Sequence, residues 1–357
     1  MSYNIAVLGA TGAVGHEMLT ILEERNFPIN NIFALASKRS VGKEVSFGDQ
    51  VLKVQDVEKF DFSEVDIALF SAGSSVSEIW APIAGEKGCI VIDNTSFFRM
   101  DPEVPLVVPE VNPEALEEYR NKNIIANPNC STIQMLVPLK PLHDLSIIKR
   151  VVVSTYQSVS GAGKSAMDEL WDQTRKMFFN ETLENKNFSK RIAFNVIPHI
   201  DQFIEDGSTK EEKKMIDETK KILDSSIEVS ATCVRVPVFI GHAESVNVEF
   251  ESNISIEEIR DILSEAPGVS LVDDIATDTY ITPIECVSDF SVFVSRLRID
   301  HTVPNGIGEL KGTRSNLIQV GLNVWMFYYE IVMLSRTVTL PISYRIAAAR
   351  LSACPVL

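Results

Sequence analysis

Paired cysteine spacings, an excess of basic residues and an apolar leader segment are all missing from this sequence of 357 residues. The cysteines are odd in number and widely spread, and none forms a Cys-x-x-Cys pair: Cys89, Cys130, Cys233, Cys286 and Cys354. This spacing argues against a disulfide framework and a zinc site, and we expect reduced thiols in a cytoplasmic protein. The N-terminus runs straight into a strand pattern, without the basic region, apolar core and cleavage site of a secretory signal.

Negative charge dominates the composition. Asp and Glu number 49 against 33 Lys and Arg, which gives a net charge of -16. This balance argues against a nucleic-acid partner, because phosphate binding needs a basic surface, but small anions can still bind where cations converge. With 45% hydrophobic residues, the chain is long enough for two domains with separate cores, and we expect a soluble globular protein.

A glycine-rich segment follows the first β-prone run. Residues 5–8 are apolar and lead directly into Gly9-Ala10-Thr11-Gly12-Ala13-Val14-Gly15, after which a helical pattern runs from 16 to 25. Strand, glycine turn and helix in this order indicate a dinucleotide site, where glycines allow close approach to the pyrophosphate and the helix N-terminus supplies N–H donors. A purely structural turn is the alternative.

The second strand, residues 32–36, ends in cations. An NAD-selective site would place an acidic residue here to bind the ribose 2′-hydroxyl, whereas this chain has Ser37-Lys38-Arg39-Ser40. Two cations and two hydroxyls suit a 2′-phosphate, so the sequence favours NADP. A solvated basic turn is the alternative.

Polar turns follow two more apolar runs. The run from 66 to 70 leads into Ser71-Ala72-Gly73-Ser74-Ser75, and the run from 90 to 92 leads into Asp93-Asn94-Thr95-Ser96-Phe97-Phe98-Arg99. Ligands of open parallel sheets bind at the carboxyl ends of strands, so both turns are candidate sites. Arg99 is a candidate anion ligand there, with a solvated surface charge as the alternative.

One cysteine stands at the expected start of a helix. The turn formers Asn127 and Pro128 precede Asn129-Cys130-Ser131-Thr132, and an apolar run follows from 133 to 142. A helix N-terminus stabilises a thiolate and can hydrogen-bond an adjacent oxyanion. Simple burial, the ordinary fate of a cysteine, remains open for Cys130 on these grounds alone.

The second half contains further candidates on expected strands. Strands are predicted over 151–159, 229–238, 245–250 and 287–299, and helices over 165–178 and 210–223, the latter with a solvated charged face. Arg235 and His242 flank a Pro and a Gly, so strand, turn and strand should bring them near one another. A structural role for His242, which we place in a loop, is the alternative to a proton acceptor for a cysteine nucleophile.

These motifs together resemble the aspartate-semialdehyde dehydrogenases, over about residues 3–308. The resemblance implies an α/β fold. A Rossmann-like dinucleotide-binding domain spans 1–130, and an α+β catalytic and dimerisation domain with a mixed sheet spans 131–309. The segments that carry it are Gly9–Gly15, Ser71–Ser74, Asp93–Arg99, Asn127–Thr132, Tyr156–Lys164, Arg235–Pro237 and Gly241–Glu244.

The resemblance also implies roles for individual residues. Cys130 matches the nucleophile, His242 the acid/base and Gln157 the amide that orients the substrate. Arg235 matches the ligand of the substrate carboxylate and Glu211 that of its amino group. Phosphate binding falls to Arg99 and Lys214, with Asn129 beside them. Cofactor contacts are implied for Gly9, Thr11, Gly12, Ala13, Val14, Gly15, Ser37, Arg39, Ser40, Ser71, Ala72, Gly73, Ser160, Gly161 and Gln319.

The activity so implied is the NADP-dependent reductive dephosphorylation of L-4-aspartyl phosphate to L-aspartate 4-semialdehyde. The reverse is a phosphorylating oxidation, and both directions pass through a Cys130 thioester. Such an enzyme serves lysine, threonine, methionine and diaminopimelate biosynthesis. We expect a homodimer that binds small molecules and inorganic phosphate, without a metal, nucleic acid or membrane.

Three other functions compete with this one. N-acetyl-γ-glutamyl-phosphate reductases usually place their cysteine in Asn-Pro-Gly-Cys-Tyr, whereas here Asn129 precedes and Ser131 follows it. A glycolytic aldehyde dehydrogenase fits less well still. An inactive NADP-binding homologue is the third alternative, because the C-terminus departs from the family.

The departure begins at residue 310. The family continues with an apolar strand and then a segment that opens a long helix back to the nucleotide domain, but here Lys311-Gly312-Thr313-Arg314 follows at once, so we expect that strand to be missing. Residues 310–357 would then be an atypical segment that forms this helix in part. A divergent or frame-disrupted end is our preferred interpretation, ahead of a lineage-specific helix and of a membrane anchor.

Overall fold

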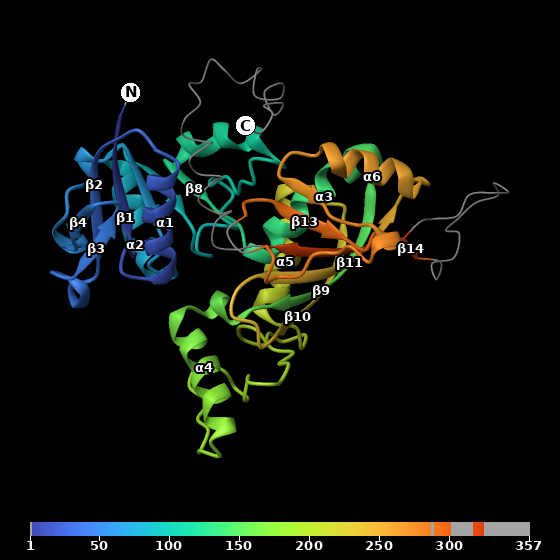
Figure 1. Ribbon diagram of the computed structural model, residues 1–357. Helices are drawn as coiled ribbons and strands as arrows, with labels where there is room; N and C mark the ends of the chain where they lie inside the picture. The colour runs from blue at the N-terminus through green and yellow to red at the C-terminus, as the bar shows by residue number, and fades with distance from the viewer. Residues whose placement is uncertain (1, 287–288, 301–316, 325–357) are drawn as a thin grey trace. The chain divides into compact units, whose positions relative to one another are not determined.

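The computed structural model of the protein describes residues 2–286 and 289–300, and the backbone of residues 317–324 (Figure 1). These residues form two compact units, of which one ends at Asn127 and the other begins at Pro128. Within these described stretches, no helix has the length and apolar character needed to cross a membrane.

The first unit contains a six-stranded parallel sheet in the order β5-β2-β1-β6-β7-β8. Its strands are β1 (Tyr3–Leu8), β2 (Ile29–Ala36), β5 (Gln55–Asp56), β6 (Ile67–Phe70), β7 (Ile90–Asp93) and β8 (Ile124–Ala126). The remaining elements are α1 (Ala13–Glu24), α2 (Ser74–Glu86), the hairpin β3 (Glu44–Phe47) and β4 (Gln50–Lys53), and the short 3-10 turns η1 (Lys38–Ser40), η2 (Val57–Lys59), η3 (Phe62–Glu64) and η4 (Pro113–Asn121).

Burial of the central strands explains why they read as continuous apolar runs. Every residue of β6 is buried, as are the last four of β1, because helices cover the sheet. Strand β1 pairs with β2 on one side and with β6 on the other. The chain therefore adds strands toward one edge of the parallel sheet before β6 and toward the other edge from β6 onward, and this switch in strand order lies at β1. Ligands of doubly wound sheets bind at such a switch. The predicted Rossmann-like architecture is confirmed.

The second unit is built on a mixed sheet in the order β10-β9-β11-β15-β13-β12, with β14 paired to β15. Strand β9 runs parallel to β10 and antiparallel to β11, which confirms the predicted mixed sheet. Its strands are β9 (Ile148–Gln157), β10 (Glu228–Arg235), β11 (His242–Phe250), β12 (Val269–Leu271), β13 (Val292–Ser295), β14 (Ile299–Asp300) and β15 (Leu317–Val324). Its helices are α3 (Cys130–Leu145), α4 (Lys164–Phe178), α5 (Lys210–Ile222) and α6 (Ile256–Glu265), with 3-10 turns η5 (Val159–Ala162) and η6 (Ile275–Thr277).

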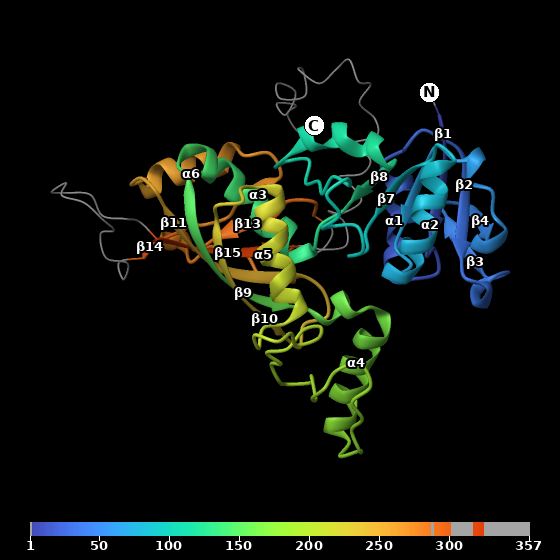
Figure 2. The ribbon, with the colours of Figure 1, turned by 180° about the vertical axis from the view of Figure 1, so that it is seen from behind.

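Helix α3 forms the centre of this unit. It packs across β9, β11 and β13, with α5 and α6 against it (Figure 2). Burial along β11 alternates strictly from His242 to Phe250, so one face of the strand lies beneath the helices and the other is partly exposed. Most of α3 is buried, although Pro138 and Pro141 interrupt its backbone hydrogen bonds. Packing therefore holds this helix where local propensity would not.

Three strand predictions need correction. Strand β10 ends at Arg235 rather than at residue 238, and β11 begins at His242, which we had expected in a loop. The long strand predicted over 287–299 is split into β13 and β14, because Arg296 between them has φ +62, a left-handed conformation that interrupts a strand.

The atypical C-terminal segment, residues 310–357, contains a strand that we did not predict. The position before Lys311, where the sequence led us to expect a missing strand, lies outside the described residues. The unpredicted strand, β15, follows that position and pairs antiparallel with β11 and with β13. It occupies residues 317–324 of the atypical segment, and the predicted returning helix lies outside the described residues. The apolar run from residue 325, on which the membrane-anchor interpretation rested, also lies outside them.

Candidate active site

The N-terminus of α3 presents the cysteine. Asn129 is the N-cap, and its Oδ1 accepts hydrogen bonds from the N–H groups of Ser131 at 2.9 Å and Thr132 at 3.3 Å. Cys130 is the first residue of the helix and is partly buried. The predicted position of the cysteine is confirmed, and it places Cys130 in the field of the helix N-terminus, which favours a thiolate.

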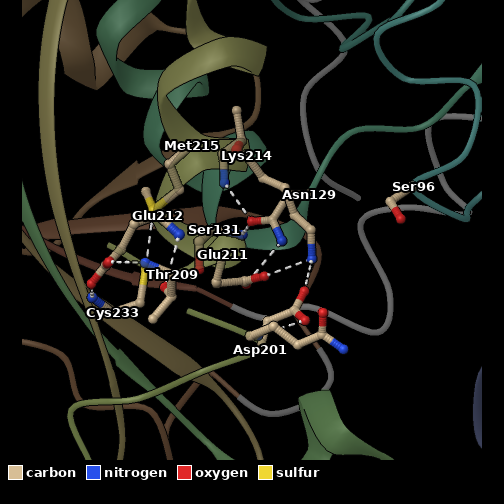
Figure 3. A network of polar contacts seen from close by, with 12 residues as sticks. Ser96, Asn129, Ser131, Asp201, Thr209, Glu211, Glu212, Lys214, Met215 and Cys233 are labelled. Atoms are coloured by element: carbon tan, nitrogen blue, oxygen red, sulfur yellow. Dashed lines mark hydrogen bonds and ion pairs between the residues drawn. The ribbon is translucent and has the colours of Figure 1, made fainter. Parts of the chain in front are cut away.

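Helix α5 supplies Glu211 and Lys214 to the site (Figure 3). A capping box at Thr209 and Glu212 starts this helix. Glu211, Lys214 and Glu218 follow at helical spacings of three and four, so they lie on one face. Glu211 and Glu218 are buried with Met215, so the solvated face expected for this helix is wrong at these positions.

Glu211 is the centre of a buried polar network. Its Oε1 accepts from Asn129 Nδ2 at 2.9 Å and from Gln157 Nε2 at 3.3 Å, and its Oε2 accepts from Lys214 Nζ at 3.1 Å. Burial alone would raise the pKa of Glu211, but Lys214 and these hydrogen bonds outweigh it and lower the pKa below its ordinary value. Glu211 is therefore ionised at neutral pH although it is only 6% exposed.

The positive charge of Lys214 is balanced by two carboxylates of the protein. Its Nζ lies 2.8 Å from Asp201 Oδ2 as well as 3.1 Å from Glu211. Burial opposes the charge of Lys214, but the two carboxylates outweigh burial and raise its pKa. Two anions thus hold the ammonium group that the family resemblance assigned to phosphate.

Parallel pairing brings two further predicted residues side by side. Gln157 ends β9 and Arg235 ends β10, and the register pairs them directly. Arg235 is buried and donates from Nη1 to the carbonyl of Ser158 at 2.7 Å. Burial lowers the pKa of Arg235, and the negative charges of Glu211 and then of Cys130 act in the opposite direction.

Gly161 shows that Arg235 and His242 face the same space. A Cβ at this position would lie 3.1 Å from Arg235 Nη1 and 3.2 Å from His242 Nε2, so the absence of a side chain at Gly161 leaves room for both groups. The predicted proximity of Arg235 and His242 is therefore confirmed. Ser160 precedes Gly161 in η5 and is buried.

The imidazole of His242 is held in one orientation. Its Nδ1 lies 3.0 Å from the backbone N–H of Ser158, which can only donate, so Nδ1 is the accepting nitrogen. Complete burial, followed by the charge of Arg235, lowers the pKa of His242 to about 3. The neutral ring then carries its proton on Nε2, which faces the space beside Gly161.

The glycine loop of the first unit has the geometry of a dinucleotide site. Gly9 has φ +94, and a Cβ there would lie 2.8 Å from Ser71 Oγ; a Cβ at Gly15 would lie 2.2 Å from the carbonyl oxygen of Gly9. Gly12 is the N-cap of α1, so the helix begins three residues before the predicted position and includes Ala13 and Val14. Backbone N–H groups at a helix N-terminus are suited to a pyrophosphate.

The basic turn after β2 lies beside this loop. Thr11 Oγ1 is within 3.5 Å of Ser40 Oγ, and Ser37, Lys38 and Arg39 are exposed. The turn Ser71-Ala72-Gly73 adjoins it from β6, with Ser71 bonded to the carbonyl of Leu8. All predicted cofactor residues of the first unit therefore lie at the carboxyl ends of β1, β2 and β6.

Arg99 belongs to the first unit. It is 8% exposed and donates to the carbonyl of Asn94 at 3.0 Å, so it is not a solvated surface charge. The same turn is fixed by Asp93, which accepts from Ser77 and Thr95.

Gln319 lies in β15, opposite Asn247 of β11. Among the described residues, no group of three or more His, Cys, Asp or Glu is placed to hold a metal.

Two residues of the network were missed at the sequence level. Asp201 forms an ion pair with Lys214, and Glu218 accepts from the backbone N–H of Asn129. The spacing of Glu218 from Glu211, two helical turns, was a usable signal. Asp201 offered none, because it lies in an irregular segment with φ +66.

Comparisons with known proteins agree with this geometry. Residues 4–119 match a family described as semialdehyde dehydrogenase, NAD binding domain, and residues 139–310 match its dimerisation domain. An aspartate-semialdehyde dehydrogenase of Rickettsia bellii is 52% identical over 85% of this chain and 90% of its own length. Aspartate-semialdehyde dehydrogenase 2 of Vibrio cholerae is also 52% identical, over 89% and 96%.

A solved structure extends this similarity to the fold. It is described as aspartate semialdehyde dehydrogenase II from Vibrio cholerae complexed with ASA, and it superposes with a TM-score of 0.89 at 48% identity. The match covers 95% of this chain and 98% of the Vibrio chain. Both units therefore have a counterpart in one known protein.

Proposed function

The chain belongs to the aspartate-semialdehyde dehydrogenase family, and we propose that it reduces L-4-aspartyl phosphate to L-aspartate 4-semialdehyde and phosphate with NADPH, through a Cys130 thioester. In reverse the reaction is a phosphorylating oxidation. The observation that carries this proposal is the convergence of Cys130, Arg235, His242 and Glu211 in the second unit. By family resemblance we further propose a cytoplasmic enzyme of lysine, threonine, methionine and diaminopimelate biosynthesis.

The charges of the site are complementary to an amino acid. Arg235 offers a planar fork of donors that matches a carboxylate, and it stays charged despite burial because arginine titrates so high. Glu211 is an ionised carboxylate that can accept from an ammonium group. Gln157 bonds Glu211 and lies beside Arg235, so it can orient a substrate held between the two.

Cys130 provides the nucleophile in this proposal. Its thiolate adds to the aldehyde carbon, and the carbonyl oxygen becomes an alkoxide on a thiohemiacetal. His242 donates a hydrogen bond from Nε2 to this alkoxide, with its ring held by Ser158. Collapse of the alkoxide expels a hydride and leaves the Cys130 thioester, and NADP is the group that accepts the hydride when bound.

Because His242 is neutral and its Nδ1 already accepts from Ser158, the ring serves as a donor in the step above. The family resemblance implies that His242 acts as both an acid and a base. This geometry favours its role as a hydrogen-bond donor, which is the acid role. Activation of the thiol falls to the α3 N-terminus and to the nearby guanidinium of Arg235.

Phosphate attack on the thioester completes the oxidative direction and gives L-4-aspartyl phosphate. We assign phosphate binding to Lys214 and Arg99. Lys214 carries a firm positive charge, and a bound phosphate would compete with Asp201 for it. Arg99 is held by Asn94 on a turn at the end of a parallel strand, where anions bind. Asn129 precedes Cys130 as the N-cap of α3, and its side chain also bonds Glu211. It therefore orders the first turn of α3, which the semialdehyde and the phosphate both approach in this proposal.

The residues of the first unit fit NADP. The loop of Gly9, Gly12 and Gly15 tolerates no side chain at its first and last glycine, which leaves its backbone open to a pyrophosphate. Lys38 and Arg39 are exposed beside that loop and suit a 2′-phosphate. Ser160, Gly161 and Gln319 are assigned to the cofactor by family resemblance.

We also propose a homodimer, supported by the match to a dimerisation-domain family. Large apolar side chains exposed on α4 and the segment after it would become buried in a second copy, as is typical of interaction sites. They are Trp171, Phe178, Phe179, Phe194 and Phe203. Sedimentation velocity of the wild type and of Trp171→Glu tests this: the variant should shift toward monomer.

One assay tests the proposed function. Reduction of NADP by L-aspartate 4-semialdehyde should require inorganic phosphate, should run far less well with NAD and should be absent with N-acetyl-glutamate 5-semialdehyde. NADP binding without any phosphate-dependent turnover would instead identify an inactive homologue.

A further inference from the structure

The backbone N–H of a helix N-cap usually finds a partner close by in sequence. In α5 the N–H of Thr209 donates to Glu212 at 2.7 Å, and in α6 the N–H of Ser255 donates to Glu258 at 2.9 Å. Both are capping boxes, in which the third helical residue supplies the carboxylate. In α3 that third residue is Thr132, which has no carboxylate to offer.

Glu218 of α5 takes this place for α3. Its Oε2 accepts from the backbone N–H of Asn129 at 2.5 Å, although the two residues are 89 positions apart. Glu218 is 1% exposed, so water does not compete for this bond.

Asn129 is thereby held by α5 at two points. Glu218 binds its backbone and Glu211, two turns away on the same helix, binds its side-chain amide at 2.9 Å. The remaining oxygen of the Asn129 side chain caps α3. Cys130 follows Asn129 directly, so both lie at the N-terminus of α3. Glu211, which binds substrate in the proposed function, and Glu218, which holds the Asn129 backbone, therefore belong to the same helix, α5.

We propose that Glu218 is a positioning residue: its hydrogen bond to the Asn129 N–H fixes the first turn of α3, which begins at Cys130, relative to the substrate-binding residue Glu211 on α5. This inference rests on the proposed function. The nucleophile must lie within a few tenths of an ångström of its attack position, and a shift of about 1 Å can lower the rate by roughly a hundredfold. The hydrogen-bond acceptor, rather than the negative charge, is what Glu218 contributes.

Three substitutions separate the acceptor from the charge. Glu218→Gln keeps an acceptor at the same reach without the charge, Glu218→Asp keeps the charge but withdraws it by one methylene, and Glu218→Ala removes both. Glu258→Ala is the matched control, because it removes the equivalent carboxylate from a capping box on α6.

We expect kcat to fall in the order wild type, Gln, Asp, Ala, with Gln within about 3-fold of wild type and Ala about 10- to 100-fold lower. KM for the semialdehyde should change by less than about 3-fold, because Glu211 and Arg235 are untouched. Glu258→Ala should keep the wild-type kcat. A general loss of packing would not produce this separation of kcat from KM.

Hydrogen exchange of the amides at 129–132 provides a readout that needs no activity. Exchange should accelerate in the Asp and Ala variants and stay slow in the Gln variant. If wild type lacks activity, the proposed function fails while this measurement still decides the role of Glu218. The proposal is overturned by an Asp variant that equals or exceeds Gln in kcat and protection, which also decides the matter if Ala does not fold.

Discussion

Replacement of Arg235 by lysine is the sharpest test of substrate recognition. The substitution keeps the positive charge but removes the planar fork, and with it the bond from Nη1 to the Ser158 carbonyl at 2.7 Å. Lysine can approach a carboxylate from only one nitrogen. We therefore expect the second charge-assisted hydrogen bond to the substrate to be lost.

The size of the effect follows from that one bond. A hydrogen bond to a charged group contributes roughly 1.5 to 3 kcal/mol, and about 1.4 kcal/mol corresponds to a factor of ten in affinity. KM for the semialdehyde should therefore rise about 10- to 100-fold. Arg235 is buried, so screening by solvent does not reduce this figure much.

Steady-state reduction of NADP at saturating phosphate measures the KM for the semialdehyde in both enzymes. Arg298→Lys serves as control, because Arg298 is exposed and donates to the carbonyl of Arg296; its KM should stay at the wild-type value. An Arg235→Lys enzyme with KM within about twofold of wild type would show that Arg235 does not grip the carboxylate by two bonds.

Three further predictions follow from the geometry. Gly161→Ala should lower kcat/KM about tenfold or more with the fold intact, since its Cβ would press on Arg235 and His242; circular dichroism and kinetics check this. Arg39→Ala should raise KM for NADP and leave KM for NAD unchanged. The pKa of Glu211 is depressed below 4.5, so its stabilisation is present above that pH and is lost as pH falls through the folded-state pKa. Urea unfolding at pH 7 and pH 4 should therefore show a larger acid loss for wild type than for Glu211→Gln.

Local chemistry made part of the site predictable. Asn127 and Pro128 are turn-forming residue types and Asn129 is a good N-cap, so the helix that begins at Cys130 was predictable from neighbouring residues. The glycine loop was equally local, because strand, turn and helix are contiguous.

Long-range packing decided the rest. Glu211 and Glu218 read as solvated charges until α5 docks on the N-terminus of α3, which buries them against Asn129. His242 begins a strand because β9 and β15 pair with it, and neither partner is near in sequence. Strand β15 itself was not foreseen, since its place is set by β11 and β13 rather than by a family-like motif.

The central claim is that Cys130 carries the acyl group. The direct measurement is mass spectrometry of the protein quenched after incubation with L-aspartate 4-semialdehyde and NADP in the absence of phosphate, where the reaction should stop at the thioester. We expect an aspartyl adduct on the peptide containing Cys130, which disappears on addition of phosphate and is absent from Cys130→Ala. A Cys130→Ala protein that still reduces NADP, or an adduct on another residue, would contradict the account.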